Sequence, residues 1–452
     1  MSYADFLATK AQLEGDHGHD PESVPDWLYP FQQDLTTWAI RKGRAAIFAD
    51  CGLGKTPMQL AWADEVRRRT GMPVLILTPL AVSFQTEAEA VKFGIDAKVS
   101  RDGKPAPWIT ITNYDRLHLF DRDQFAGVVA DESSAIKNFD GERRKIVTEF
   151  MRTLPYRLLA TATAAPNDYI ELGTSSEALG HLGHMDMLGR FFTNSQNTSK
   201  AVRNWTGDKW RFKGHAEEEF WRWVSSWARA LRKPSDLGYP DTFELPPLNI
   251  RQQIVEAREP TPDRLFDLPA MGLQEERSEM RRTLEERCEA AADALEDADS
   301  AVSWCHLNPE SELLTKLIDG AVQIKGSSDP DEKEEALQAF ADGQIRVLVT
   351  KPSIAGWGLN WQHCNRMTYF PSHSYEQWYQ AIRRSWRFGQ TRPVTVDVIA
   401  TEGTSRVLAN LERKAEQADR MFESLTAHMR DAVNIDRNIN YPNPVEVPAW
   451  AS

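Results

Sequence analysis

Residues 45–66 read AAIFADCGLGKTPMQLAWADEV, and this stretch decides the fold. Its apolar start is typical of a buried strand, its centre is a turn with glycines, and its end has the composition of a helix. Backbone N–H groups at such a helix start can face phosphates, so strand, glycine turn and helix predict a phosphate-binding loop. Ala49 stands where the common motif begins with glycine, and Pro57 falls in the first helical turn, where a missing N–H costs little.

The residues at the end of the loop carry the chemistry of ATP binding. Gly52 and Gly54 allow the backbone to approach phosphates. Lys55 is expected to reach the β- and γ-phosphates, and the Thr56 hydroxyl is expected to ligate Mg²⁺. The alternative is a glycine turn that ends in Gly-Lys-Thr by chance. ATP and Mg²⁺ are therefore the predicted nucleotide and metal.

An acidic pair follows a second apolar run in the segment GVVADE, residues 127–132. ATP hydrolysis needs one carboxylate for Mg²⁺ and another that activates water. We assign the first role to Asp131 and the second to Glu132. The alternative is a solvated turn, but both residues close an apolar strand in the block that contains Lys55.

The whole chain contains two blocks in which short apolar runs alternate with helical segments. The expected strands are AAIFA, PVLILTP, WITITNY, GVVADE and YRLLATAT in the first block, and SAVSWCH, AVQIKG, IRVLVTK, RMTYF and VTVDVIA in the second. This alternation predicts parallel sheets covered by helices, hence two α/β domains. We place the first domain at 1–232, a proline-rich linker at 233–275, the second domain at 276–435 and a tail at 436–452.

Composition limits the class of protein. The chain has 452 residues, 41% of them hydrophobic, and a formal net charge of −13, which is unusual for a passive nucleic-acid binder. No apolar run approaches the roughly 20 residues that span a bilayer, and the start lacks the features of a secretory signal. The four cysteines form no C-x-x-C pair, which favours a reducing compartment. We expect a cytoplasmic protein without a membrane partner.

Several segments together resemble superfamily-two helicases, and among them the Swi/Snf-type DNA translocases, in the compact form found in bacterial viruses and their hosts. ADCGLGKT (49–56) is similar to the first motif of this family, in which the leading glycine is commonly absent. DESSAIKN (131–138) is similar to its DEGH-x-x-KN box, with Ser134 at the position of histidine. The resemblance implies two tandem RecA-like domains of the P-loop NTPase class and assigns Ser134 to coupling between the ATP and DNA sites.

Other motifs of the first block extend this resemblance. LYPFQ (28–32) resembles the entry motif and assigns Gln32 to adenine recognition. The segments that begin LTPLAV and ITNYDRL resemble those that contact one DNA strand, which implies Thr78, Asn113 and Tyr114 as contacts. LLATATAAPNDYIEL resembles a further box and assigns coupling roles to Thr161 and Thr163.

The second block carries the arginine motif YEQWYQAIRRSWRFGQ, residues 375–390. Its spacing places Arg384 and Arg387 on one helix face, from which both could stabilise charge on the γ-phosphoryl group across an interdomain cleft. Similarity to the family motif adds Gln380 as a coupling residue. TKPSIAGWGLNWQ (350–362) resembles another family motif, in which Gly358 would let backbone approach the nucleotide.

An insert at 195–232 mixes aromatic and basic residues, and among the latter Arg211 and Lys213 could bind DNA phosphates. Phe220, Trp223 and Trp227 recur at helical spacing and predict a core face instead.

The sequence thus predicts a monomeric motor that hydrolyses ATP between two domains and moves on double-stranded DNA in a bacterial or phage-infected cell. One alternative is a strand-separating helicase on DNA or RNA. Another is an ATP-gated nucleic-acid-binding switch that moves nothing.

Overall fold

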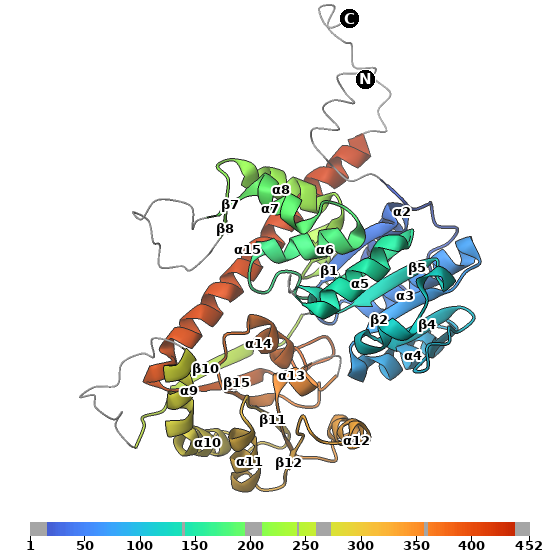
Figure 1. The fold of residues 1–452 in the computed structure, drawn as a ribbon. Helices are drawn as coiled ribbons and strands as arrows, with labels where there is room; N and C mark the ends of the chain where they lie inside the picture. The colour runs from blue at the N-terminus through green and yellow to red at the C-terminus, as the bar shows by residue number, and fades with distance from the viewer. Residues whose placement is uncertain are drawn as a thin grey trace, which may run out of the picture.

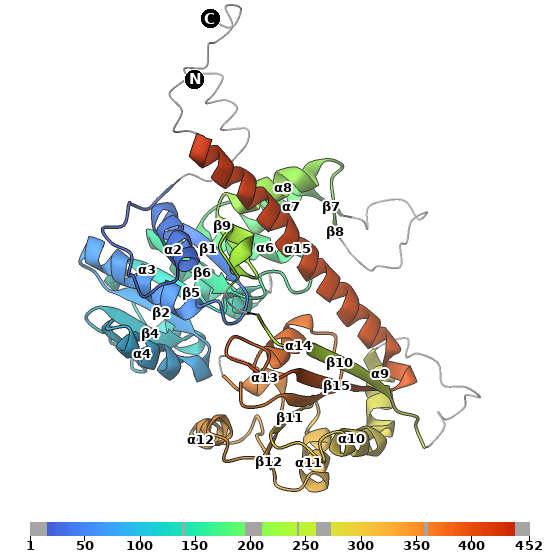
Figure 2. The same ribbon diagram turned by 180° about the vertical axis from the view of Figure 1, so that it is seen from behind.

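The computed structural model describes residues 16–137, 141–194, 210–241, 244–258, 273–356 and 360–438. These residues form two α/β lobes, and one long helix, α15 (Ser405–Asn438), runs across both of them (Figures 1 and 2). No helix within the described ranges is long and apolar enough to cross a bilayer.

The first lobe is built on a parallel seven-stranded sheet with the order β3-β4-β2-β5-β6-β1-β9. In chain order the lobe contains α2 (Pro30–Lys42), β1 (Arg44–Ala49), α3 (Lys55–Thr70), β2 (Val74–Thr78), α4 (Ser83–Lys92), β3 (Ala97–Val99), β4 (Ile109–Asn113), β5 (Gly127–Asp131), α5 (Glu142–Thr153), β6 (Tyr156–Thr161), α6 (Leu172–Leu179), α7 (His184–Phe191), β7 (Phe192–Asn194), β8 (Trp210–Phe212), α8 (Ala216–Ser225) and β9 (Ala228–Leu231). Strands β7 and β8 form a separate antiparallel hairpin.

The second lobe is built on a parallel six-stranded sheet with the order β10-β15-β14-β11-β13-β12. Its elements are β10 (Leu248–Ile254), α9 (Leu273–Arg282), α10 (Leu284–Asp293), β11 (Ala301–Trp304), α11 (Asn308–Leu317), β12 (Ala321–Gln323), α12 (Pro330–Ala341), β13 (Val347–Thr350), α13 (Pro352–Ala355), β14 (Arg366–Tyr369), α14 (Tyr375–Ile382), β15 (Val394–Ala400) and the start of α15.

Short 3₁₀ turns connect these elements. They are η1 (Leu80–Val82), η2 (Tyr114–Leu119), η3 (Arg122–Gln124), η4 (Ser133–Ile136), η5 (Tyr169–Glu171), η7 (Pro234–Leu237) and η8 (Glu402–Thr404).

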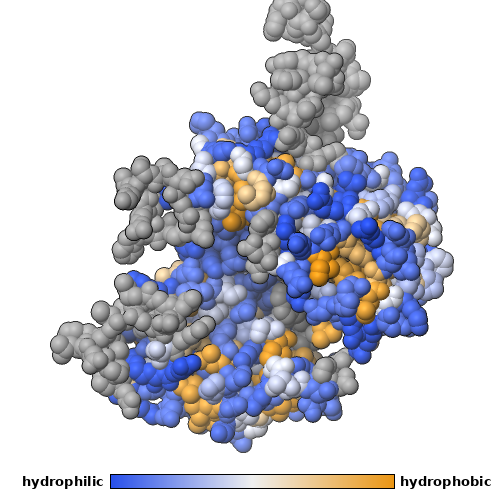
Figure 3. Space-filling view, viewed as in Figure 1, coloured by the Kyte–Doolittle hydropathy of each residue, from blue (hydrophilic) through white to orange (hydrophobic). Residues whose placement is uncertain are grey.

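Both sheets are covered by helices on two faces, which explains why the strands read as unbroken apolar runs. In the first lobe, Ile47 faces a core shared with α2, α3 and α4, whereas its neighbour Phe48 faces a core shared with α5, α6, α7 and α8. In the second lobe, α10 and α11 cover one face, and α12, α13 and α14 cover the other. On the face seen in Figure 3 the surface is largely hydrophilic, with hydrophobic areas on each lobe.

All ten strands expected from the sequence are present, and so is the α/β class with parallel sheets. The sequence missed β3, β7, β8, β9 and β10. Each lies at an edge of its sheet, where one side of the strand has no neighbour and the apolar pattern is weak. Strand β10 also falls inside the segment expected to be a linker, but it pairs along its whole length with β15.

The aromatic half of the insert belongs to the core of the first lobe. Phe220, Trp223 and Trp227 are all buried, which confirms the core face expected from their spacing. Phe220 and Trp223 lie on α8, and Trp227 stacks edge-on against Phe48 of β1. The chain then forms β9 beside β1, so the end of the insert is part of the sheet.

Helix α15 belongs to both lobes. Leu411 and Ala418 pack in the core of the second lobe, and the next turns place Phe422 and Leu425 in the core of the first. Asp419 forms an ion pair with Arg232 of the first lobe at 2.6 Å, and the Arg232 guanidinium lies over the Phe422 ring. The sequence assigned this segment to the second domain alone, because its apolar pattern does not show which sheet it will cover.

We predict that Leu425→Ala lowers the free energy of unfolding by about 2–5 kcal/mol, since it removes a fully buried side chain and leaves a cavity. Urea denaturation followed by tryptophan fluorescence measures the change. Glu423→Ala, an exposed position on the same turn, is the control and should change stability by less than about 0.5 kcal/mol. Equal effects of the two substitutions would show that α15 does not contribute to the core.

Candidate nucleotide site between the two lobes

The predicted phosphate loop lies between β1, which ends at Ala49, and α3, which begins at Lys55. Gly52 and Gly54 adopt positive φ angles of 87° and 76°, a region that glycine enters without steric cost. The loop therefore turns sharply enough to present its N–H groups at the start of α3, as phosphate binding requires.

Close packing is a second reason for both glycines. A Cβ atom at Gly54 would lie 2.2 Å from Gln32 Nε2, and one at Gly52 would lie 3.0 Å from Phe388 Cβ in the second lobe. Gln32 Nε2 donates to the Leu53 carbonyl at 2.9 Å, and Gln32 Oε1 accepts from the Tyr29 N–H at 3.0 Å. Gln32 therefore fixes the loop, and the same residue is the one expected to read adenine.

Lys55 points its Nζ back at the loop, where it donates to the carbonyls of Ala49 at 3.0 Å and Asp50 at 3.4 Å. Thr56 follows it on the first turn of α3. Gln59, three residues further on the same helix face, donates to Asp131 Oδ1 at 2.7 Å. Helix α3 therefore brings Thr56 and Asp131 to the same end of the first sheet.

The acidic pair is buried at the carboxyl end of β5. Burial, and then repulsion from Glu132, raises the pKa of Asp131 to about 7. Tyr114 Oη donates to the main-chain carbonyl of Asp131 at 2.6 Å and holds this end of the strand in place. A cation beside the pair would relieve the repulsion.

Glu132 has a left-handed backbone, with φ 50° and ψ 54°, and no other non-glycine residue in the described ranges has a positive φ. Such strain persists at functional sites where the surroundings enforce it. The Glu132 carboxylate accepts a hydrogen bond from Thr161 Oγ1 at 3.2 Å, and Thr161 Oγ1 also accepts from the Thr163 N–H at 3.0 Å. Thr161, at the end of β6, thus connects the side chain of Glu132 to the loop that follows this strand.

The oxygen donors present suit Mg²⁺. The Thr56 hydroxyl and the Asp131 carboxylate are hard ligands, and Mg²⁺ in nucleotide sites takes few protein ligands besides phosphates and water. The described residues contain no cluster of three or more His, Cys, Asp or Glu side chains that could hold a metal on its own.

The second lobe supplies an arginine-rich segment directly after α14. The helix ends at Ile382, so Arg384 and Arg387 lie in the turns that follow it, and the single helix face predicted from their spacing is wrong. Arg384 is buried and its Nε donates to the Gln380 carbonyl at 3.0 Å. Burial, and then repulsion from Arg384, lowers the pKa of Arg387 to about 10. Cys51 and Glu89 of the first lobe lie close enough to oppose that shift. Arg387 therefore lies at the interface with the phosphate loop.

Two ion pairs join α14 and the residues after it to the nucleotide loops of the first lobe. Arg383 Nη2 pairs with Asp50 Oδ2, and Lys137 Nζ pairs with Glu376 Oε2. Tyr379 Oη also donates to Asp50 Oδ1. The sequence did not predict these contacts, because Asp50 and Arg383 stand at positions of the two motifs to which no role was assigned.

The residues predicted to couple ATP and DNA sites lie in this interface. Ser134, Thr163 and Gln380 are buried, and within the described part of the chain their side-chain polar atoms have no hydrogen-bond partner. Buried polar groups without partners are unusual. Gly358, expected near the nucleotide, lies outside the described residues.

The residues predicted to contact DNA are separated by the structure into buried and exposed sets. Thr78 is fully buried with its hydroxyl 2.8 Å from Ser83 Oγ, and Tyr114 is buried under Asp131. Their burial argues against direct contact with a DNA strand. Asn113 is also mostly buried and caps η2 by accepting from the Arg116 N–H at 3.2 Å.

Arg211 and Lys213 are exposed on and just after β8, where phosphates could reach them. Of the other basic residues of the insert, Lys200, Arg203 and Lys209 lie outside the described residues.

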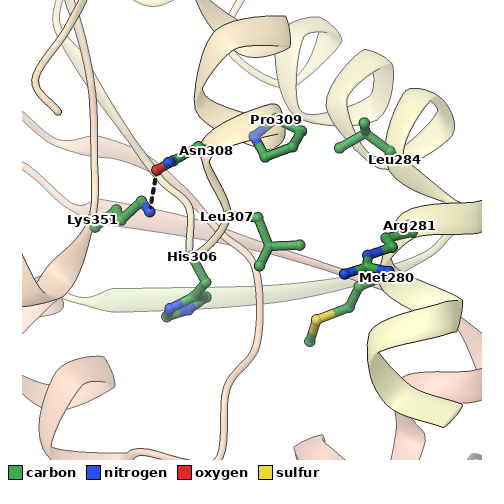
Figure 4. A pocket seen from close by; sticks show the side chains of 8 residues that line it. All are labelled: Met280, Arg281, Leu284, His306, Leu307, Asn308, Pro309 and Lys351. Atoms are coloured by element: carbon green, nitrogen blue, oxygen red, sulfur yellow. Dashed lines mark hydrogen bonds between the residues drawn. The ribbon is translucent and has the colours of Figure 1, made fainter. Parts of the chain in front are cut away.

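A separate pocket of 440 Å³ lies in the second lobe, away from the phosphate loop (Figure 4). It is lined by Met280, Arg281, Leu284, His306, Leu307, Asn308, Pro309 and Lys351. Lys351 Nζ donates to Asn308 Oδ1 at 2.7 Å, and both residues follow the carboxyl ends of neighbouring strands, β13 and β11. The pocket combines an apolar floor with two cations, Arg281 and Lys351.

Comparison with known proteins identifies a family for the second lobe. Residues 299–389 match the model of the helicase conserved C-terminal domain. This match spans β11 to the end of the arginine motif and stops before β15.

Two curated relatives are similar to this chain, one over most of its length and the other over less than half of it. The mouse DNA annealing helicase and endonuclease ZRANB3 is 23% identical over 447 residues, covering 88% of this chain and 41% of the relative. The helicase SWR1 of Cryptococcus neoformans is 28% identical over 236 residues, covering 43% of this chain and 18% of the relative. The chain thus spans less than half the length of the curated relatives it matches.

Among solved structures, the Sulfolobus solfataricus SWI2/SNF2 ATPase core in complex with dsDNA matches 90% of this chain and 95% of its own, with 18% identity and a TM-score of 0.42.

Proposed function

Since the chain is a Swi/Snf-type helicase of superfamily two, we propose that it hydrolyses ATP between its lobes and uses the energy to move along double-stranded DNA. One observation carries this proposal: the phosphate loop of one lobe faces the arginine-rich segment of the other, with Asp50 paired to Arg383, Gly52 packed beside Phe388 and Cys51 close to Arg387. Lobes that share one ATP site in this way change their relative position as the nucleotide binds, reacts and leaves.

In the first lobe, Lys55 binds the β- and γ-phosphates once it leaves the carbonyls of Ala49 and Asp50. Thr56 and Asp131 would hold Mg²⁺, and the ion would neutralise negative charge on the phosphate oxygens. Glu132 orients the attacking water and accepts its proton, and its hydrogen bond to Thr161 connects that step to the loop after β6.

In the second lobe, Arg384 and Arg387 stabilise the charge that develops on the γ-phosphoryl group. The lowered pKa of Arg387 supports this role, because two adjacent buried guanidiniums repel each other until an anion lies between them. Gln32 holds the phosphate loop and contacts the adenine. Ser134, Thr163 and Gln380 transmit the state of the nucleotide to the DNA-binding surface through their unpaired polar groups.

DNA phosphates are bound by exposed cations on both lobes. The candidates are Arg211 and Lys213 near β8, and Arg281 and Lys351 at the pocket of the second lobe (Figure 4). Contacts of this kind are independent of base sequence and depend strongly on salt, as a motor that travels along DNA requires. The mouse relative is a DNA annealing helicase and endonuclease, and this similarity supports DNA as the partner.

The proposal is tested by comparing ATPase rates without nucleic acid and with saturating single-stranded DNA, double-stranded DNA or RNA. We expect duplex DNA to stimulate the ATPase rate most, because binding to the duplex would fix the two lobes in the arrangement that completes the ATP site. Displacement of a triplex strand, compared with unwinding of a gapped duplex, then separates a translocase from a strand-separating helicase. A rate that stays at its basal level with every nucleic acid would favour the ATP-gated switch instead.

We expect Glu132→Gln to bind ATP normally and to lower kcat by about 10²- to 10⁴-fold, since glutamine cannot accept a proton from water. Steady-state phosphate release and binding of a fluorescent ATP analogue measure the two properties. Glu149→Gln on the exposed face of α5 is the control. Turnover at the wild-type rate in Glu132→Gln would remove this residue from the assigned role.

Arg387→Ala is expected to lower kcat by about 10³-fold and to change ATP affinity much less, because its guanidinium acts on charge that develops in the transition state. Arg392→Ala, an exposed arginine of the same lobe, serves as the matched control. A loss of affinity as large as the loss of kcat would mean that Arg387 only binds the nucleotide.

A further inference from the structure

A third arginine lies at the interface, and no motif assigns it a role. Arg383 directly precedes Arg384, yet its guanidinium turns to Asp50, the first residue after β1. Both side chains are almost fully buried, with 9% and 7% of their surfaces exposed. The Arg383 guanidinium also lies over the rings of Tyr379 and Trp386, which hold it in place from two sides.

The Asp50 carboxylate is the centre of this contact. It accepts hydrogen bonds from the Cys51 N–H at 2.5 Å, from Tyr379 Oη and from Arg383 Nη2. Two of the three donors come from the second lobe. A buried carboxylate needs a cation, and Lys55 does not serve, because its Nζ donates to the main-chain carbonyls of Ala49 and Asp50.

The ionisation of Arg383 follows from these neighbours. Burial opposes its charge, but Asp50 and then Tyr379 raise the pKa of Arg383 above its ordinary value. Arg383 therefore carries its positive charge at neutral pH.

We propose that Arg383 is a positioning residue of the ATPase reaction, which acts through Asp50 and not on the nucleotide. It cancels the negative charge at the start of the phosphate loop, and this leaves Lys55 available to the triphosphate. It also holds the end of α14 against the loop, where Phe388 packs on Gly52 and Arg387 lies beside Cys51. The inference rests on the proposed function, because it concerns the same ATP site.

The ion pair between Lys137 and Glu376 supports this arrangement. Glu376 lies at the start of α14 and Lys137 follows the acidic pair by five residues. One short helix is thus tied at one end to the phosphate loop and at the other to the loop that carries Glu132. The lobes can then close only when both nucleotide loops are in place.

The test uses four variants whose expected effects on the KM for ATP differ in size. Arg383→Gln leaves Asp50 without a counter-ion, so it should raise the KM for ATP by about tenfold to a hundredfold. Asp50→Asn should leave KM within about threefold of wild type, because the remaining positive charge attracts phosphate. Asp50→Asn combined with Arg383→Gln should return KM to within about threefold as well, and Arg383→Lys should recover part of the loss.

Each pattern of results has one meaning. If the double variant is as impaired as Arg383→Gln, Arg383 binds the nucleotide directly and the inference is wrong. If Arg383→Gln has a normal KM, the ion pair has no role in the reaction. Arg122→Gln, which removes a surface arginine 3.9 Å from Asp123, is the control for a general effect of losing an arginine.

A second measurement needs no ATPase activity, so it separates failure of this inference from failure of the proposed function. Cys51 is partly exposed, whereas Cys288, Cys305 and Cys364 are buried. Arg383→Gln should increase the rate at which Cys51 reacts with a thiol reagent by about tenfold, because the end of α14 leaves the loop. Arg383→Lys should increase it less, and Cys51→Ser should abolish the reaction. Equal rates in wild type and Arg383→Gln would overturn the inference even if the protein proved to have no ATPase activity.

Discussion

The contact between α14 and the phosphate loop is the constraint on which the rest of the site depends. Phe388 packs on Gly52 at the edge of this contact, and the Arg383 guanidinium forms a buried ion pair with Asp50. A side chain at Gly52 or an unpaired charge at Asp50 would separate the lobes. Because Arg384 and Arg387 lie on the same segment, whatever holds that segment against the loop also sets their position relative to bound phosphates.

Helix α15 limits the motion that this contact can undergo. Its early turns pack in the second lobe, and its later turns place Phe422 and Leu425 in the core of the first (Figures 1 and 2). Opening of the cleft must therefore occur as a rotation about this helix or by bending within it, since pulling its apolar side chains out of either core would cost several kcal/mol. The helix therefore restricts how the two sheets can change their relative orientation.

The strained backbone of Glu132 shows how the acidic pair takes part in the same linkage. Its left-handed conformation turns the carboxylate toward Thr161, while Asp131 is held by Gln59 and Tyr114. Adjacent carboxylates are thereby given different partners, which suits one for metal binding and the other for proton transfer. Ser134 and Thr163, buried beside this pair without partners in the described ranges, are the groups most able to change hydrogen bonds between states.

The sequence by itself determined the two parallel sheets, the phosphate loop and the acidic pair, because each depends on a local pattern of apolar runs, glycines and short-range spacing. It could not show that Arg383 pairs with Asp50, which lies 333 positions away in the chain. It also could not show that Tyr114, predicted to contact DNA, donates a hydrogen bond to the main chain of Asp131. It also could not show that α15 covers the first lobe. Only the tertiary structure decided these features. A charged residue or an apolar helix face in the sequence shows which kind of partner it requires, but it does not show where in the chain that partner lies.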